Sequence, residues 1–154
     1  MNKNAIEFGM GKMELGPAPI NPDWIIEGSP VTRNKLVSSS ADGNASTWLW
    51  DCTAGKFNWF YDCDETVYLI AGSVSIKDSA GGTRHLKAGD TVFFPAGSSA
   101  EWHVQRYVRK VAFLRTPLPW PLQIAKRVYH RLKRFVSISN GGRKHTSPAM
   151  FQSQ

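Results

Sequence analysis

Hydrophobic and polar residues alternate with a period of two through most of the first 116 residues, as in strands that bury one face. Between 57 and 65 the alternation places Phe57, Trp59, Tyr61, Cys63 and Glu65 on one face of a predicted strand. Further predicted strands cover 33–40, 47–53, 66–70, 73–77, 83–87, 91–94, 101–105 and 107–115, and 53–56 is predicted to be a turn. Short strands without intervening helices predict an all-β sandwich or barrel.

The pattern changes after residue 116. Prolines at 117, 119 and 121 remove backbone donors that a sheet needs. From 122 to 136 apolar residues recur at nearly helical spacing, and basic residues fill most positions between them, which predicts a basic amphipathic helix. We expect its apolar stripe to pack on its own barrel or on a partner subunit. Weak binding of 122–136 to an anionic membrane is the alternative.

The length of 154 residues favours one globular domain. We divide the chain into an N-terminal arm (1–23), a barrel (24–116), a Pro-rich turn with the basic helix (117–140) and a disordered tail (141–154). Residues 1–116 carry twelve Lys and Arg and twelve Asp and Glu, whereas residues 117–154 carry seven basic residues and no acidic one. The whole net charge of +7 therefore lies in the tail. No groove of interleaved aromatic residues accompanies this charge, so nucleic acid is not an expected partner.

The sequence predicts a cytoplasmic protein. It contains no run of about 18 apolar residues that would span a membrane. The N-terminal residues lack the apolar core of a signal peptide. The two cysteines, Cys52 and Cys63, do not make a disulfide framework, and we expect both to be reduced.

Two motifs resemble the signature motifs of the cupin superfamily, whose fold is a double-stranded jelly-roll barrel. Counting back from Gly72 places Glu65 on the glutamate of the first motif. In the second motif Gly89, Pro95 and Gly97 match at the expected intervals. The resemblance implies an all-β cupin barrel, to which the basic amphipathic helix is appended at the C-terminal end.

A longer stretch, about 24–115, is similar to small cupins related to the cupin domains of (S)-ureidoglycine aminohydrolase. This resemblance implies a hydrolase that uses a divalent cation held by histidine and carboxylate ligands. The motif positions for histidine, however, hold Trp59, Tyr61 and Ala100. A catalytic cation needs at least three good donors, and a phenol with a pKa near ~10 is a poor one. Glu65 alone does not suffice, so we predict neither a metal nor another cofactor.

The candidate site residues follow from the motif register. Glu65 and Tyr61 are the candidate catalytic groups. The predicted pocket lining comprises Trp59, Cys63, Trp102 and Ala100. Each has a purely structural alternative: Glu65 paired with a neighbouring arginine or with backbone donors, and the aromatic residues packed as core. For Arg109, Lys110 and Arg115, contact with an anionic ligand at the barrel mouth is one option, and a solvated strand face is the other.

Three function classes remain open. We favour a metal-independent cupin that binds a small polar metabolite inside the barrel. Conversion of that metabolite, and with it enzymatic activity, is left open. The alternatives are a metal-dependent hydrolase like (S)-ureidoglycine aminohydrolase, and a non-catalytic assembly or membrane-peripheral protein acting through the basic helix. We also expect a homodimer in which N-terminal residues pair across subunits, because the apolar segment 24–26 requires a partner surface.

Overall fold

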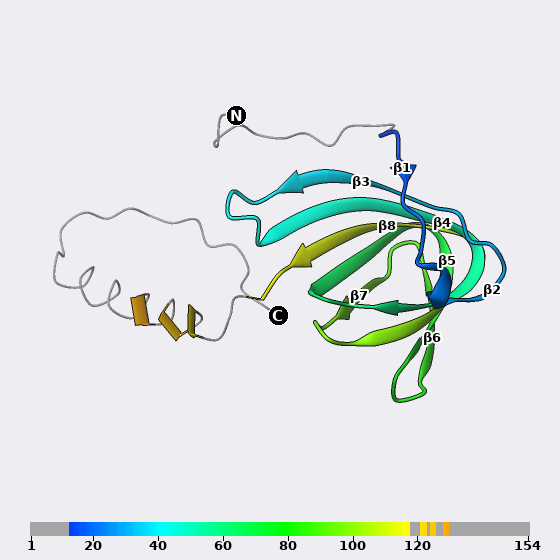
Figure 1. Ribbon diagram of the computed structural model, residues 1–154. Helices are drawn as coiled ribbons and strands as arrows, with labels where there is room; N and C mark the ends of the chain where they lie inside the picture. Colours follow the sequence, from blue (N-terminus) through cyan, green and yellow to red (C-terminus); the bar gives the residue numbers. More distant parts are fainter. Residues whose placement is uncertain (1–12, 118–120, 123, 126–127, 130–154) are drawn as a thin grey trace. The chain divides into compact units, whose positions relative to one another are not determined.

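The computed structural model describes residues 13–117, 121–122, 124–125 and 128–129. The chain divides into two units, Met1–Pro117 and Leu118–Gln154. The elements of the first unit are β1 (Gly16–Pro17), η1 (Pro22–Trp24), β2 (Ile25–Glu27), β3 (Thr32–Ser39), β4 (Ala45–Phe60), β5 (Asp64–Asp78), β6 (Thr83–Lys87), β7 (Thr91–Phe94) and β8 (Ser99–Arg115) (Figure 1). In the second unit 121–122, 124–125 and 128–129 are helical, and the remainder of the predicted helix lies outside the described residues. The all-β prediction is confirmed, whereas the C-terminal helix is not.

All strand pairs are antiparallel, and β8 lies at the centre of the sheet. The strand order is β1-β3-β4-β8-β5-β6, with β2 paired to β4 and β7 paired to β5. β8 pairs with β4 along one edge and with β5 along the other for nearly its whole length. The sheet curves around a common interior, which we call the barrel (Figure 1).

The long strands β4 and β5 each extend over more than one predicted strand. The predicted turn at 53–56 is wrong, because β4 runs without interruption from Ala45 to Phe60 and the register only shifts between Thr53 and Gly55. A Cβ atom on Gly55 would lie 2.8 Å from the ring of Pro30, so this glycine permits close packing inside a strand. The strand predicted at 57–65 ends at Phe60, and Glu65 belongs to β5.

Gly72 bends β5 across β8. Its φ of +73° lies in the left-handed region, and a Cβ atom would lie 2.0 Å from the carbonyl oxygen of Tyr107. The register with β8 shifts on both sides of this glycine. The buried positions accordingly change from odd numbers, such as Val67 and Leu69, to even numbers, such as Val74 and Ile76.

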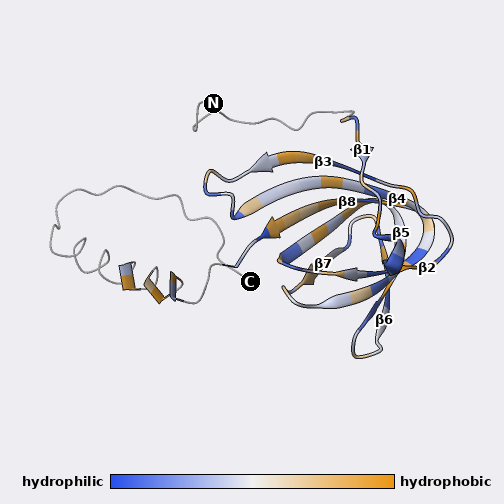
Figure 2. Cartoon of the chain, viewed as in Figure 1, coloured by the Kyte–Doolittle hydropathy of each residue, from blue (hydrophilic) through white to orange (hydrophobic). Residues whose placement is uncertain are grey.

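The core is aromatic and lies on the inner face of the long strands. Its largest fully buried side chains are Trp102 and Phe57, which stack with ring centroids 6.2 Å apart. Figure 2 shows hydrophilic and hydrophobic residues following one another along the strands, as expected where only one face is buried. The outer face nevertheless exposes several large apolar side chains, namely Tyr68, Ile70, Phe93 and Phe113.

The segment 24–26 finds much of its apolar partner surface within its own barrel. Trp24 makes edge contacts with Trp59 and Phe60, at centroid distances of 5.7 and 5.2 Å. Ile25 also packs against the core, and Ile26 remains 48% exposed. The homodimer stays a prediction, with a single exposed isoleucine as its evidence in this segment.

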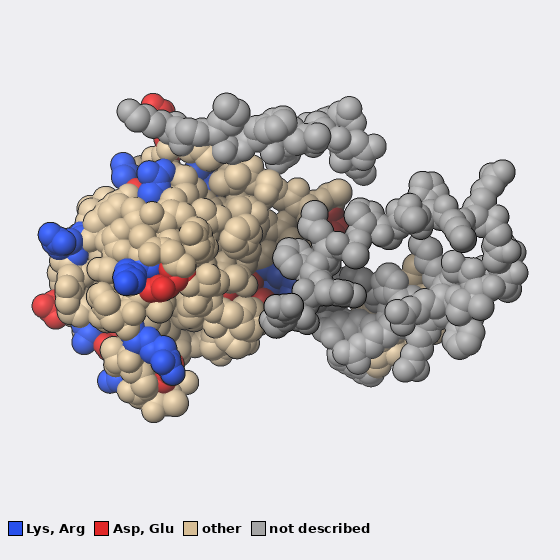
Figure 3. All heavy atoms as spheres, turned by 180° about the vertical axis from the view of Figure 1, so that it is seen from behind, with Lys and Arg blue, Asp and Glu red and all other residues tan. Residues whose placement is uncertain are grey.

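Charges on the barrel surface are mixed in sign. Figure 3 shows lysine and arginine side chains interspersed with acidic ones over the visible part of the barrel. This agrees with the equal numbers of basic and acidic residues in 1–116. Within the described residues, no helix has both the length and the apolar character needed to cross a bilayer.

Candidate ligand site in the barrel

Glu65 lies near the start of β5 and turns its side chain into the barrel, where only 7% of the residue is exposed. Its Oε1 atom accepts a hydrogen bond from Nζ of Lys110 at 2.6 Å. Lys110 lies on β8, opposite Leu69 of β5 and Trp50 of β4, and is 4% exposed. The two side chains form an ion pair in the aromatic interior.

Three tryptophan rings surround the ammonium group of Lys110. Nζ lies 4.9 Å from the ring centroid of Trp50, 4.8 Å from that of Trp102 and 5.8 Å from that of Trp59. Cation–π attraction of this kind grows when the cation is removed from water. The three rings and Glu65 therefore form a cage with a strong preference for positive charge, and Lys110 occupies it.

Tyr61 follows β4 and is held by the loop that precedes β8. Its backbone N–H donates to the carbonyl of Ser98, and its carbonyl accepts from the N–H of Gly97. Its ring stacks on Phe94 at 4.2 Å, and Nε1 of Trp102 donates to its hydroxyl oxygen at 2.9 Å. Burial, and secondarily the charge of Glu65, raise the pKa of Tyr61. The phenol stays protonated at neutral pH, and no described residue accepts its proton.

The remaining predicted pocket residues lie around this centre. Ala100 is buried on β8 opposite Trp59 of β4. Trp59 is partly buried and packs against Trp50 and Phe57. Cys63 lies in the link between β4 and β5 and is partly exposed. Burial, together with Glu65 and neighbouring aspartates, raises the pKa of its thiol, so Cys63 is a poor nucleophile at neutral pH.

Lys110 is the residue that the sequence analysis did not assign to the site. The sequence predicts for Lys110 either contact with an anionic ligand at the barrel mouth or a position on a solvated strand face, whereas the structure makes it the buried partner of Glu65. The signal for its position was the period of two along β8, because Val108, Lys110 and Ala112 share one face and both neighbours are buried. Arg115, by contrast, is exposed and pairs with Asp64 at the end of the strand.

The described residues contain no group of three or more His, Cys, Asp or Glu side chains suited to hold a metal ion. The carboxylate that occupies the motif position is already engaged by an ammonium group at 2.6 Å. A second cation at the same oxygen would be repelled by Lys110. The donor set therefore does not fit a metal centre of the kind that the aminohydrolase resemblance implies.

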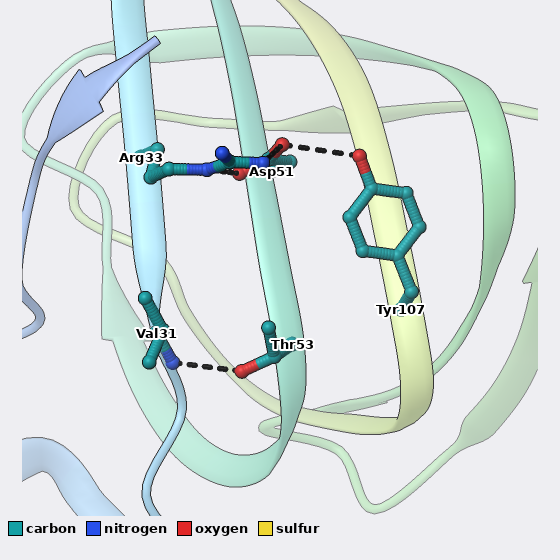
Figure 4. Close-up of polar contacts among 5 residues, drawn as sticks. All are labelled: Val31, Arg33, Asp51, Thr53 and Tyr107. Carbon is teal, nitrogen blue, oxygen red and sulfur yellow. Dashed lines mark hydrogen bonds and ion pairs between the residues drawn. The ribbon is translucent and has the colours of Figure 1, made fainter.

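A second buried carboxylate lies on the outer face of the same sheet (Figure 4). Asp51 of β4 is 2% exposed and accepts two hydrogen bonds from Arg33 of β3, at 2.7 and 3.0 Å. The hydroxyl of Tyr107 on β8 donates a third at 3.0 Å. Nearby, Val31 N–H donates to the hydroxyl of Thr53 at 2.8 Å. The cluster fastens three adjacent strands together.

Comparison with known proteins supports the fold. Residues 39–112 match the model of the EutQ-like cupin domain. A DUF861 family protein of unknown function from Pseudomonas syringae pv. tomato is 24% identical with a TM-score of 0.60, and the match covers 74% of this chain and 46% of that one. The EutQ protein of Clostridium difficile is 22% identical with a TM-score of 0.50, covering 56% and 64%. A cupin-like protein from Thermotoga maritima is 14% identical with a TM-score of 0.55, covering 69% and 81%.

The match thus spans about half the length of the Pseudomonas protein and less than two thirds of the Clostridium one. No curated protein matches the chain. At these identities the structural likeness concerns the fold, and the narrower resemblance to (S)-ureidoglycine aminohydrolase cupins is not confirmed. The comparisons support the cupin fold: residues 39–112 match the EutQ-like cupin model, and the chain shares its fold with EutQ and DUF861 proteins.

Proposed function

We propose that the protein binds a small polar metabolite inside the barrel without a metal ion, and that Glu65, Lys110 and Tyr61 are the polar groups that hold it. One observation carries the proposal, namely the Glu65–Lys110 ion pair in a cage of tryptophan rings. Ligand sites in proteins typically combine such an apolar, aromatic lining with a few convergent polar groups.

A buried ion pair is a weak source of stability. Desolvating two charges costs several kcal/mol per ion, and the attraction between them offsets this only when further hydrogen bonds satisfy both groups. Here Oε2 of Glu65 receives no hydrogen bond from any described residue. The proton of the Tyr61 hydroxyl likewise has no described acceptor. One acceptor oxygen and one donor hydroxyl are therefore left for a ligand among largely apolar side chains.

Lys110 supplies a fixed positive charge beside Glu65, where a metal-dependent cupin would use a bound cation. An ammonium group attracts a ligand oxygen as a metal ion does, although more weakly. Unlike a metal ion, the lysine side chain cannot dissociate from the site. Because Glu65 and the tryptophan rings hold its ammonium group, Lys110 is better placed to bind an oxygen than to attack a carbonyl carbon. Any reaction in the barrel would then use Glu65 for proton transfer and Tyr61 as a hydrogen-bond donor.

The charge of the site constrains the ligand. Glu65 and Lys110 together are neutral, so a ligand with a net charge would carry an uncompensated charge into a low-dielectric interior. We infer a neutral or zwitterionic molecule that presents an oxygen to Lys110 or Tyr61 and an N–H or O–H group to Glu65. The two alternative functions, a metal-dependent hydrolase and a membrane-peripheral protein, are not favoured by any described contact.

Native mass spectrometry with elemental analysis tests the proposal. We expect the purified protein to carry a small molecule and less than one equivalent of transition metal, and Glu65→Gln to lose the molecule without unfolding. Glu101→Gln is the matched control, because Glu101 pairs with Lys56 at 3.1 Å in a more exposed position. A full equivalent of metal that is lost on Glu65→Gln would refute the proposal, and so would a bound molecule that both variants retain.

A further inference from the structure

A groove on the outer face of the barrel is separate from the Glu65 site. Its volume is about 520 Å³, which falls in the range of small-ligand pockets. It lies where the ends of β3 and β8 meet the starts of β4 and β5, and it reaches β7. We call it the outer groove.

One row of five side chains crosses the outer groove. The strand registers place Ser38 beside Thr47, Thr47 beside Phe113, Phe113 beside Thr66, and Thr66 beside Phe93. Neighbouring strands lie about 4.8 Å apart, so hydroxyl groups and phenyl rings follow one another at that spacing. Phe113 has a threonine on each side.

These side chains have little to contact within the protein. Phe113 is 48% exposed and Phe93 is 56% exposed. The hydroxyls of Ser38, Thr47 and Thr66 make no hydrogen bond to any described residue. Elsewhere in the groove the hydroxyl groups are engaged, for example Ser46 Oγ, which accepts from Trp48 Nε1 at 3.0 Å. The row therefore offers three unused hydroxyls and two exposed rings, with Thr66 between the rings.

The charged groups of the outer groove neutralise each other. Arg115 pairs with Asp64, and the backbone N–H of Ala96 donates to the same carboxylate at 3.0 Å. The amide of Ala96, followed by Arg115, lowers the pKa of Asp64, so the carboxylate stays charged and paired at neutral pH. The groove consequently has no net charge to attract an ion.

We propose that the outer groove binds a neutral polyhydroxylated ligand, a saccharide of one or two rings. The C–H face of a sugar ring is apolar and packs on an aromatic ring, while its hydroxyl groups donate and accept hydrogen bonds around the rim. The row in the groove has the complementary arrangement, with Phe113 flanked by Thr47 and Thr66. A purely apolar partner would leave those hydroxyls without hydrogen bonds, at a cost of roughly 1–3 kcal/mol each.

Titration of the ¹⁵N-labelled full chain with methyl glucoside, maltose, cellobiose and trehalose, followed by NMR, tests this proposal. We expect at least one of these sugars to shift the amide signals of 38–47, 64–66, 93 and 113–115 at millimolar concentration. Phe113→Ala should weaken that binding at least tenfold, and Thr47→Val should weaken it severalfold. Phe60→Ala is the matched control, because Phe60 is also 48% exposed and lies outside the groove.

Glu65→Gln should leave the sugar titration unchanged, which separates this site from the one in the barrel. The proposal is overturned if none of the four sugars shifts these signals, or if Phe113→Ala and Phe60→Ala behave alike. It is also overturned if Phe113→Ala instead converts a dimer to a monomer in light scattering, because the groove would then be an interface between copies of the chain. Thermal melts of each variant establish that it is folded.

Discussion

The barrel contains two buried carboxylates, one on each face of the sheet, and their environments differ. Asp51 on the outer face accepts three hydrogen bonds, two from Arg33 and one from Tyr107 (Figure 4). Glu65 on the inner face accepts one, from Lys110. The side chain of Arg33 is 51% exposed, whereas that of Lys110 is 5% exposed.

The difference separates a structural carboxylate from a functional candidate. Asp51 uses both of its oxygens within the fold, and its cationic partner keeps contact with water. Glu65 has an oxygen without a hydrogen bond, and its partner Lys110 is buried among the tryptophan rings. Fully satisfied buried networks rigidify a structure. The unused oxygen of Glu65 is instead the acceptor that the proposed ligand would engage.

Removal of the buried ammonium should have the largest effect. Lys110→Met leaves the charge of Glu65 buried without a partner, and we expect the free energy of unfolding to fall by about 3–5 kcal/mol. Arg33→Met should cost clearly less, since Tyr107 still donates to Asp51 and water can replace the exposed guanidinium. Urea unfolding of both variants measures the two changes, with Lys56→Met as a surface control. Equal losses for Lys110→Met and Arg33→Met would contradict the distinction.

Alkaline pH should lower the stability of the fold by an intermediate amount, because Cys52, the residue next to Asp51, is buried. Burial, followed by the charge of Asp51, raises the pKa of the inward-facing Cys52 from 9.0 to about 12. Between these values the unfolded chain loses the thiol proton while the folded chain keeps it, so stability falls as pH rises from about 9 to 12. Melting temperatures measured across this window should fall less steeply for Cys52→Ala than for the unmodified chain. Parallel curves would show that another group causes the decline.

The smallest change in stability is expected from the double variant Lys110→Met/Glu65→Leu. Replacing both partners of a buried ion pair by apolar residues is often neutral or stabilising. We therefore expect its unfolding midpoint in urea to return close to that of the unmodified chain, while any co-purified small molecule is lost. A double variant as unstable as Lys110→Met alone would indicate that the pair is required for folding.

The inward direction of the motif residues was predictable because the motif spacing sets the register. Glu65, Tyr61, Trp102 and Ala100 are all buried, as expected of residues that face the barrel. This happened although the strand predicted at 57–65 is in fact the end of β4, a link and the start of β5. The motif register depends only on the number of residues between the glycines, so an error in the strand boundaries does not change it.

Lys110 was not predictable in the same way. A single lysine in an alternating strand is ordinarily on the solvated face, and its partner lies 45 residues away in the sequence. Its place on the same face as Val108 and Ala112 follows from the period of two along β8. Its partner Glu65 and the rings of Trp50 and Trp59, however, come from other strands.

The central position of β8 affects how the protein folds during its synthesis on the ribosome. Among the strands of the described residues β8 is synthesised last, yet it pairs with both long strands, so β4 and β5 have no central partner until Arg115 has been added. Synthesis proceeds at about 5–20 residues per second, so the aromatic inner face of the preceding strands stays uncovered for several seconds. Closure of the barrel therefore depends on contacts that are distant in the sequence and follows the synthesis of β8.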